Sequence, residues 1–219
     1  MSNTNGNIIK ENGITFYMES SSSKACIDID VDDGIETFEF IKNDKVREYK
    51  LRNLKKSFPN IKKLVISSRI NVDMPNTLFP NVREVDCGYY VNYKSGKVFI
   101  REGNYYSGTV VTNTFCCQAD EAVDLKGVNE ISDGAFEGCE STKLVNATCI
   151  RKCSNQAFRN SAIGRMQPER GKALIVGPIL VDFDNTADNI VIPDNRQTIT
   201  AIRDGVNFAG VKTITIHKI

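Results

Sequence analysis

The chain has 219 residues, of which 41% are hydrophobic and 25% are charged. It carries 28 Lys and Arg against 27 Asp and Glu, and this net charge of +1 argues against a surface wholly devoted to nucleic acid or anionic lipid. The longest apolar stretch, residues 173–181, contains Gly177 and Pro178 and is too short to span a bilayer, which takes about 20 helical residues. We therefore expect an ordinary globular protein of one or two domains with no membrane association.

The N-terminal residues 1–7 are polar and are predicted to be disordered. They lack the basic start and the apolar core of a secretory signal. If Met1 is the natural start, the sequence predicts a cytoplasmic protein. A cell-surface or secreted protein is the alternative if the sequence is a fragment of a longer chain.

Residues 14–17, 26–31 and 36–41 alternate apolar and polar side chains with period two, which is typical of half-buried strands. Asp32-Asp33-Gly34 separates the second and third of these strands like a hairpin turn. We expect residues 1–50 to form an N-terminal β-hairpin cap, because the end of a repeat stack would otherwise expose its core to water.

Residues 42–69 are rich in basic side chains and follow an acidic stretch between residues 28 and 39. The basic side chains are Lys42, Lys45, Arg47, Lys50, Arg52, Lys55, Lys56, Lys62, Lys63 and Arg69. This segment is either a patch that meets a phosphate backbone or a solvated surface neutralised by the neighbouring acids. Only Tyr49 and Phe58 could stack on bases, so nucleic-acid binding is the less favoured interpretation.

A repeat begins after the cap. Residues 58–66 read Phe-Pro-Asn-Ile-Lys-Lys-Leu-Val-Ile, and residues 79–87, 21 positions later, read Phe-Pro-Asn-Val-Arg-Glu-Val-Asp-Cys. Residues 208–216 have the same form, and each unit ends in the apolar-x-apolar pattern of a short strand. A period between 20 and 50 residues indicates a solenoid, here over residues 51–219.

Successive strands can be aligned by one outward-facing central residue in each. These central residues are Val65, Asp86, Asp124, Asn146, Gln167, Val191 and Thr215. Their apolar neighbours are expected to stack into continuous core columns. The long step from Asp86 to Asp124 contains an insertion, residues 89–112, whose Gly-containing turns predict a β-hairpin.

Two consecutive units share an Ala-Phe pair 22 residues apart, Ala135-Phe136 and Ala157-Phe158. They resemble the repeat of BspA-like leucine-rich repeat proteins, in which an Ala-Phe pair and a following Cys, here Cys139, mark the turn opposite the strand. The resemblance covers about residues 51–219. It implies an α/β leucine-rich-repeat solenoid, with short strands forming a curved sheet and short helical or 3-10 turns opposite. It also implies binding or adhesion to partner proteins, and members of this family are often exported.

The seven cysteines are an odd number and two are adjacent, so reduced thiols are expected. Cys149 and Cys153 have no histidine nearby, and their spacing does not favour zinc. No catalytic motif, cofactor site or metal site is predicted. A thiol enzyme using Cys116 or Cys117 is kept as a third hypothesis, which fast labelling of that pair would support.

The outward face of the predicted sheet is the expected binding surface, because solenoids commonly hold partners there. Its candidate residues are Lys63, Glu84, Asp86, Asp124, Lys126, Asn146, Arg165 and Gln167. The insertion adds Tyr89, Tyr90 and Tyr105, which either anchor a partner or cover the interrupted solenoid. The sequence thus favours a non-enzymatic module that binds a protein, with a cell-surface adhesin or nucleic-acid binding through residues 42–69 as alternatives. The last strand has an open edge, so a monomer or an edge-paired homodimer is expected.

Overall fold

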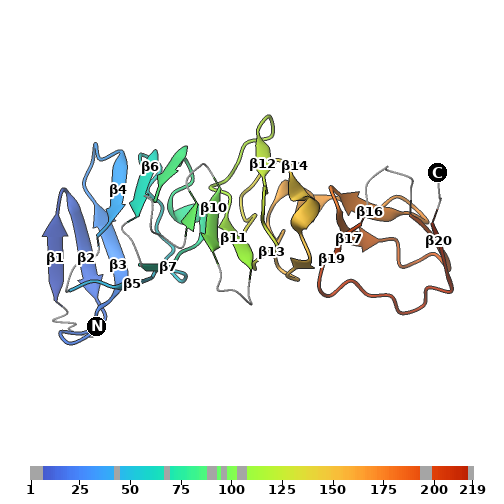
Figure 1. The fold of residues 1–219 in the computed structure, drawn as a ribbon, viewed down its shortest axis with the longest axis horizontal. Helices are drawn as coiled ribbons and strands as arrows, with labels where there is room; N and C mark the ends of the chain where they lie inside the picture. The colour runs from blue at the N-terminus through green and yellow to red at the C-terminus, as the bar shows by residue number, and fades with distance from the viewer. Residues whose placement is uncertain are drawn as a thin grey trace. The chain divides into compact units, whose positions relative to one another are not determined.

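The computed structural model describes residues 7–41, 45–66, 70–87, 93–94, 98–102, 108–192 and 199–216. These residues are mostly short β-strands, stacked coil upon coil as a β-solenoid with little helix (Figure 1). The chain divides into two compact units, residues 1–99 and residues 100–219. Across the described ranges, no helix has the length and apolar character needed to cross a membrane.

Unit 1 begins with three antiparallel strands, β1 (Ile8–Glu11), β2 (Ile14–Met18) and β3 (Ala25–Val31), which lie side by side in Figure 1. Asn12 and Gly13 join β1 to β2, and both have positive φ, as a two-residue hairpin turn requires. The same sheet continues in parallel fashion through β5 (Glu48–Lys50) and β7 (Asn71–Asp73).

A second sheet of unit 1 contains β4 (Thr37–Phe40), β6 (Lys63–Ile66) and β8 (Glu84–Asp86), all parallel and in register. We call these strands the first strand row of unit 1, and the strands aligned with them by the sequence repeat, β12 (Ala122–Asp124) and β14 (Lys143–Val145), the first strand row of unit 2. Leu64, Ile66 and Val85 point into the core, which confirms the predicted alternation in this row. The strands β5 and β7 form a second row that the sequence did not indicate, so each of these coils carries two strands.

The predicted hairpin between residues 26–31 and 36–41 is wrong, because β3 and β4 belong to different sheets. The chain passes from one sheet to the other through the exposed residues Asp32–Gly34, and Phe38 of β4 then faces Phe16 of β2 with their ring centroids 6.0 Å apart. Burial of the phenylalanines of β2 and β4 against each other favours placing β4 in a second sheet over pairing it with β3 in a hairpin. Phe79, in the turn after the 3-10 helix η1 (Asn76–Leu78), completes the aromatic core of unit 1.

The short strand β9 (Tyr93–Lys94) and β10 (Phe99–Glu102) lie within the predicted insertion, together with most of β11 (Thr109–Asn113). In unit 2, β11 pairs in parallel with β13 (Glu130–Ile131), which pairs in parallel with β15 (Lys152–Cys153). The first row contains β12 (Ala122–Asp124) and β14 (Lys143–Val145), also parallel. The 3-10 helix η2 (Ala147–Cys149) and the four-residue α1 (Ala162–Arg165) are the helical elements of the described part of this unit.

The Ala-Phe pairs lie where the coils approach one another, as predicted. Ala135 and Ala157 are fully buried, and the backbone N–H of Phe136 donates to the carbonyl oxygen of Ala157 at 3.1 Å. The rings of Phe136 and Phe158 meet edge to face with their centroids 5.0 Å apart. Small side chains permit this backbone contact between coils, and the two rings fill the space beneath.

The predicted register is wrong by one position at residues 143–145, whereas Asn146 is exposed and Ala147 is buried, as predicted. Leu144, expected to face outward, pairs with the buried Val123, while Val145, expected to face inward, is 40% exposed. Asn146 follows the strand with φ at 55°, a left-handed conformation that asparagine tolerates better than most residues. The strand therefore ends before Asn146, and a one-residue shift exchanges the two faces.

The predicted strand around Gln167 is also wrong. The Ser161 hydroxyl accepts a hydrogen bond from the N–H of Gly164 and caps α1, so the chain turns as a helix up to Arg165. Met166, expected to face inward, is 38% exposed. A hairpin of β16 (Ala173–Val176) and β17 (Ile179–Phe183) follows, with Gly177 and Pro178 in its turn.

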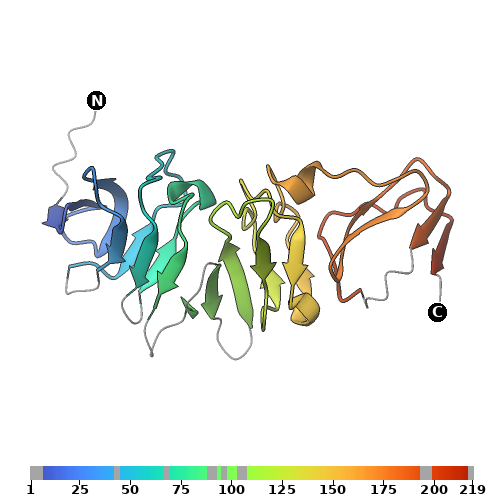
Figure 2. The same ribbon diagram turned by 90° about the horizontal axis from the view of Figure 1, so that it is seen from above.

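The end of unit 2 contains β18 (Asn189–Ile192) and β20 (Thr213–Ile216), which pair in parallel with the predicted offset of 24 residues and lie side by side next to the C-terminus in Figure 2. Between them in sequence, β19 (Ala201–Ile202) pairs with β17, and the adjacent Arg203 forms a parallel bridge with Cys153 of β15. Ile214 of β20 is 44% exposed although its partner Ile190 is buried, because no further described coil covers the last one.

Candidate functional site

The predicted binding residues of unit 1 lie together on the outward face of the first strand row. Lys63 on β6 pairs in register with Glu84 on β8, and its Nζ lies 2.7 Å from Glu84 Oε1 and 3.9 Å from Asp86 Oδ2. The hydrogen bond to Glu84 raises the pKa of Lys63, and the charges of Glu84 and Asp86 add to this effect. Glu39 of β4, Glu84 and Asp86 outnumber Lys63, so this face of unit 1 is acidic.

The predicted residues of unit 2 form a smaller polar group. Asn146 Nδ2 donates to Asp124 Oδ1 at 2.9 Å, and the backbone N–H of Lys126 donates to the same oxygen at 3.0 Å. Asp124 and Lys126 are exposed, as predicted. Asp124 therefore holds the turn after β12 and the end of β14 together.

Arg165 and Gln167 do not belong to the first strand row. Arg165 is the last residue of α1 and forms an ion pair with Glu140, while Gln167 lies in the irregular segment that follows. Tyr89, Tyr90 and Tyr105 lie outside the described residues.

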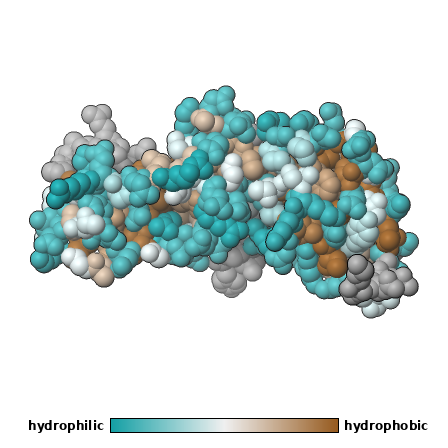
Figure 3. All heavy atoms as spheres, turned by 180° about the vertical axis from the view of Figure 1, so that it is seen from behind, coloured by the Kyte–Doolittle hydropathy of each residue, from teal (hydrophilic) through white to brown (hydrophobic). Residues whose placement is uncertain are grey.

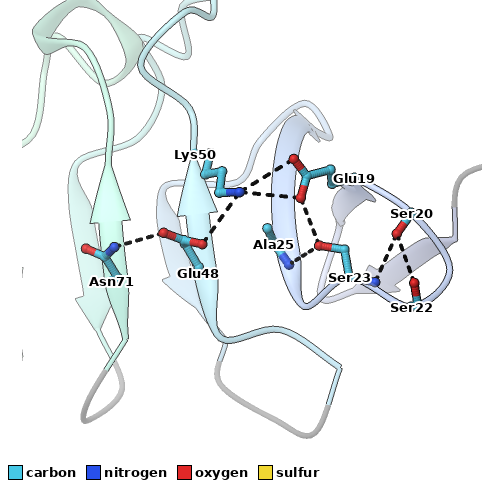
Figure 4. Close-up of polar contacts among 8 residues, drawn as sticks. All are labelled: Glu19, Ser20, Ser22, Ser23, Ala25, Glu48, Lys50 and Asn71. Carbon is cyan, nitrogen blue, oxygen red and sulfur yellow. Dashed lines mark hydrogen bonds and ion pairs between the residues drawn. The ribbon is translucent and has the colours of Figure 1, made fainter.

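The basic segment, residues 42–69, contains no helix in its described part and is engaged with acidic neighbours (Figure 4). Lys50 Nζ lies 3.4 Å from Glu19 Oε2 and 3.8 Å from Glu48 Oε2, and Asn71 Nδ2 donates to Glu48 at 3.0 Å. Arg52 pairs with Asp73 at 2.7 Å. Lys42 and Arg69 lie outside the described residues.

Lys56 of the same segment bridges two aspartates of β3. Its Nζ lies 2.7 Å from Asp28 Oδ1 and 2.9 Å from Asp30 Oδ1, and the hydroxyl of Tyr17 donates to Asp30 Oδ2 at 2.7 Å. Hydrogen bonds from Lys56 and then Tyr17 lower the pKa of Asp30. Because these cations already have carboxylate partners, they are less available to a phosphate backbone.

A cavity of about 200 Å³ lies in unit 2, between α1 and the β16–β17 hairpin, and we call it the Arg203 pocket. Its polar wall is formed by Asn155, Gln156, Arg159, Gln167, Asp182 and Arg203. Its apolar wall is formed by Phe158, Ile163, Gly164, Met166, Leu174 and Val181. Of the predicted binding residues, Gln167 alone lines this pocket.

Arg203 fixes the geometry of the pocket by joining three segments. Its Nε donates to the carbonyl oxygen of Val181 at 2.8 Å, and its Nη1 donates to the carbonyl and side-chain oxygens of Asn155, both at 3.0 Å. No sequence pattern indicates this pocket, because its residues are spread over about 50 positions and share no motif.

The buried cysteines differ in their acidity. Cys139 is fully buried, as predicted, and its pKa is lowered to about 7, first because the Cys117 side chain hydrogen-bonds to it. Cys117 is fully buried too, and burial raises the pKa of the half-buried Cys116 to about 11. A raised pKa leaves little nucleophilic thiolate at neutral pH. Cys149 is the one cysteine of the seven that is exposed.

We expect native thiol labelling with a bulky aromatic disulfide at pH 7.5 to show one fast-reacting group, Cys149, because the reagent cannot reach the buried sulfurs. The Cys149→Ser variant should lose the fast phase, and Cys116→Ser should keep it. The reverse pattern would support the thiol-enzyme hypothesis instead.

Comparison with family models, with curated proteins and with solved structures found no match for this chain.

Proposed function

We propose that the protein is a non-enzymatic module that binds a partner protein through the first strand row. The supporting observation is the acidic face of unit 1, where in-register parallel strands hold Glu39, Glu84 and Asp86 in columns around Lys63. Parallel strands lie about 4.8 Å apart, so these side chains form a rigid array of fixed spacing. An acidic array selects a partner with basic side chains and speeds its association.

The character of the surface supports recognition by polar contacts. On the face shown in Figure 3, hydrophilic residues predominate and hydrophobic residues form several separate groups between them. Non-obligate interfaces are about as polar as the rest of a protein surface.

The repeat itself supports the proposed likeness to BspA-like leucine-rich repeats. The buried pairs Ala135-Phe136 and Ala157-Phe158 and the buried Cys139 occupy the turn side of consecutive coils. In the same proposal residues 1–50, which contain β1, β2 and β3, serve as the N-terminal cap. A cell-surface adhesin would use the same face toward an extracellular partner.

Affinity capture tests the proposal with the double variant Glu39→Lys, Glu84→Lys. We expect the amount of captured partner to fall at least about tenfold below the amount captured by the wild type, because the acidic face becomes basic. Native lysate and a crude extracellular fraction should both be used as sources, and nuclease treatment identifies capture through nucleic acid.

The matched control is Glu11→Lys, Asp33→Lys, which makes the same change of charge at exposed residues of unit 1 outside the first strand row. Circular dichroism and urea unfolding should show that both double variants fold like the wild type. Equal loss in both variants would mean that only net charge matters, and unchanged capture by the first would exclude the acidic face.

A further inference from the structure

The Arg203 pocket brings together cationic, amide and apolar groups that no strand-row function requires. We propose that it binds an apolar group that bears a carboxylate, either the C-terminal apolar residue of a polypeptide or a small apolar carboxylate. This proposal goes beyond the partner-binding face of unit 1 and does not depend on it.

The guanidinium of Arg203 is the expected anchor for the carboxylate. Its bonds to Val181 and Asn155 fix the plane of the group and use Nε and Nη1. Nη2 has no hydrogen-bond partner among the residues that the structure describes. An arginine held in one orientation loses little entropy on binding, and its planar fork matches a carboxylate.

The rest of the polar wall also favours an anion. The guanidinium of Arg159 also lines the pocket, but it is paired with Glu137 Oε2 at 3.0 Å and is therefore less available to a carboxylate than that of Arg203. The side-chain amides of Gln156 and Gln167 have no partner in the described part of the chain and can donate to a carboxylate. Against these, the wall contains the single carboxylate Asp182, whose Oδ1 accepts the N–H of Phe183 at 2.9 Å.

The apolar wall sets the size of the group. Phe158, Ile163 and Val181 are at most 4% exposed and form a rigid floor, while the 38% exposed Met166 can close over a bound side chain. Pockets for drug-sized ligands measure roughly 300–1,000 Å³. A cavity of about 200 Å³ therefore suits one apolar side chain, such as that of leucine.

Calorimetric titration tests the chemistry with N-acetyl-leucine and its amide, and with a short Gly-Ser peptide that ends in leucine, as acid and as amide. We expect the acids to bind at least about tenfold more tightly than the amides, because the amides lose the charge-assisted bonds. Tighter binding of the peptide acid than of N-acetyl-leucine would identify a polypeptide ligand, and equal binding a small carboxylate. Equal binding of acids and amides, or no binding of any probe at millimolar concentration, would overturn the proposal.

Charge variants at Gln167 locate the site without disturbing the bonds of Arg203. Gln167→Glu should weaken binding of the acid probes several-fold, and Gln167→Lys should strengthen it by a similar factor, because Gln167 is exposed and lines the pocket. Thr142→Glu and Thr142→Lys place the same charges at an exposed residue outside the pocket wall and should change nothing.

Arg203→Lys retains the positive charge but loses the planar guanidinium that can bind a carboxylate through two hydrogen bonds. It should therefore also weaken binding of the acid probes. If Arg203→Lys also lowers the stability of the protein, the variants Gln167→Glu and Gln167→Lys still test the proposal. Unchanged affinity for the acid probes in both Gln167 variants would show that the probes bind elsewhere. The strand-row variant Glu39→Lys, Glu84→Lys should bind the acid probes like the wild type, which separates the two proposals.

Discussion

Replacement of Phe79 by alanine is expected to destabilise unit 1 by about 3–5 kcal/mol. The Phe79 ring is fully buried and lies 4.9 Å from the ring of Phe38 and 6.3 Å from that of Phe40, measured between centroids. Removing it leaves a cavity at the centre of the aromatic core, and the strands on either side are held in register by parallel pairing and cannot collapse into it. Urea unfolding followed by far-ultraviolet circular dichroism measures this loss.

Phe58→Ala is the matched control, because Phe58 also contacts Phe79, at 6.0 Å between centroids, but is only half-buried. We expect it to cost clearly less than Phe79→Ala, since the exposed part of the ring contributes little burial. Equal losses would show that the aromatic core is not centred on Phe79.

The second large effect is expected at Gly164, where alanine should destabilise unit 2 by about 1–3 kcal/mol. A Cβ atom at this position would lie 2.0 Å from the carbonyl oxygen of Phe158 and 3.0 Å from its carbonyl carbon. The obstacle is backbone, so no side-chain rotation relieves the clash. In an ordinary helix the same change is favourable by roughly 0.5–1 kcal/mol, so the sign of the effect distinguishes the two cases.

Ala162→Gly, in the same short helix, is the control for this experiment. It creates no clash and should cost no more than about 1 kcal/mol, the usual difference in helix propensity. Because Gly164 lines the Arg203 pocket, Gly164→Ala should also impair binding of the acid probes. Stabilisation by Gly164→Ala would mean that α1 does not pack on Phe158 in solution.

The first strand row of unit 1 could be predicted from the sequence because β6 and β8 alternate strictly over three or four residues. In β6, Leu64 and Ile66 are buried between the partly exposed Lys63 and Val65, and the same pattern recurs 21 residues later in β8. The aligned repeat then fixes the register, since side chains in a strand change faces at every step. The Ala-Phe pairs were also predictable, because they recur at the repeat distance and only small residues permit the backbones of neighbouring coils to touch.

The short strands β13, β15 and β19 of unit 2 could not be predicted in this way. β13, β15 and β19 each contain only two residues, which is too short for any periodicity. Their positions depend on pairing with the preceding and following coils, which are distant in the sequence, so no short stretch of sequence indicates them. Gly177-Pro178, which forms the turn of the β16–β17 hairpin, is visible in the sequence as a break within an apolar run. Periodicity alone, however, does not distinguish one buried strand from two short ones.

Of the candidate site, the sequence indicated the exposed acids of the first strand row but not the Arg203 pocket. Lys63, Glu84 and Asp86 follow from alternation within neighbouring strands. The pocket depends on Arg203 reaching Asn155, 48 residues away, and on α1 replacing the strand expected around Gln167. A single helix cap at Ser161 thus decides whether these side chains line a sheet or a cavity.

The position of β19 has a consequence for the order in which the protein folds during synthesis. The N–H of Arg203 donates to the carbonyl oxygen of Leu180 at 2.9 Å, and the N–H of Asp204 donates to that of Cys153 at 2.7 Å, so this segment lies between β17 and β15. In a regular solenoid each coil docks on the one before it as the chain emerges. Here the β16–β17 hairpin leaves the ribosome before the segment that joins it to the preceding coil. The sheet pairing of the C-terminal third of unit 2 is therefore completed only after Asp204 has emerged, whereas the coils around Ala135 and Ala157 can be added one at a time.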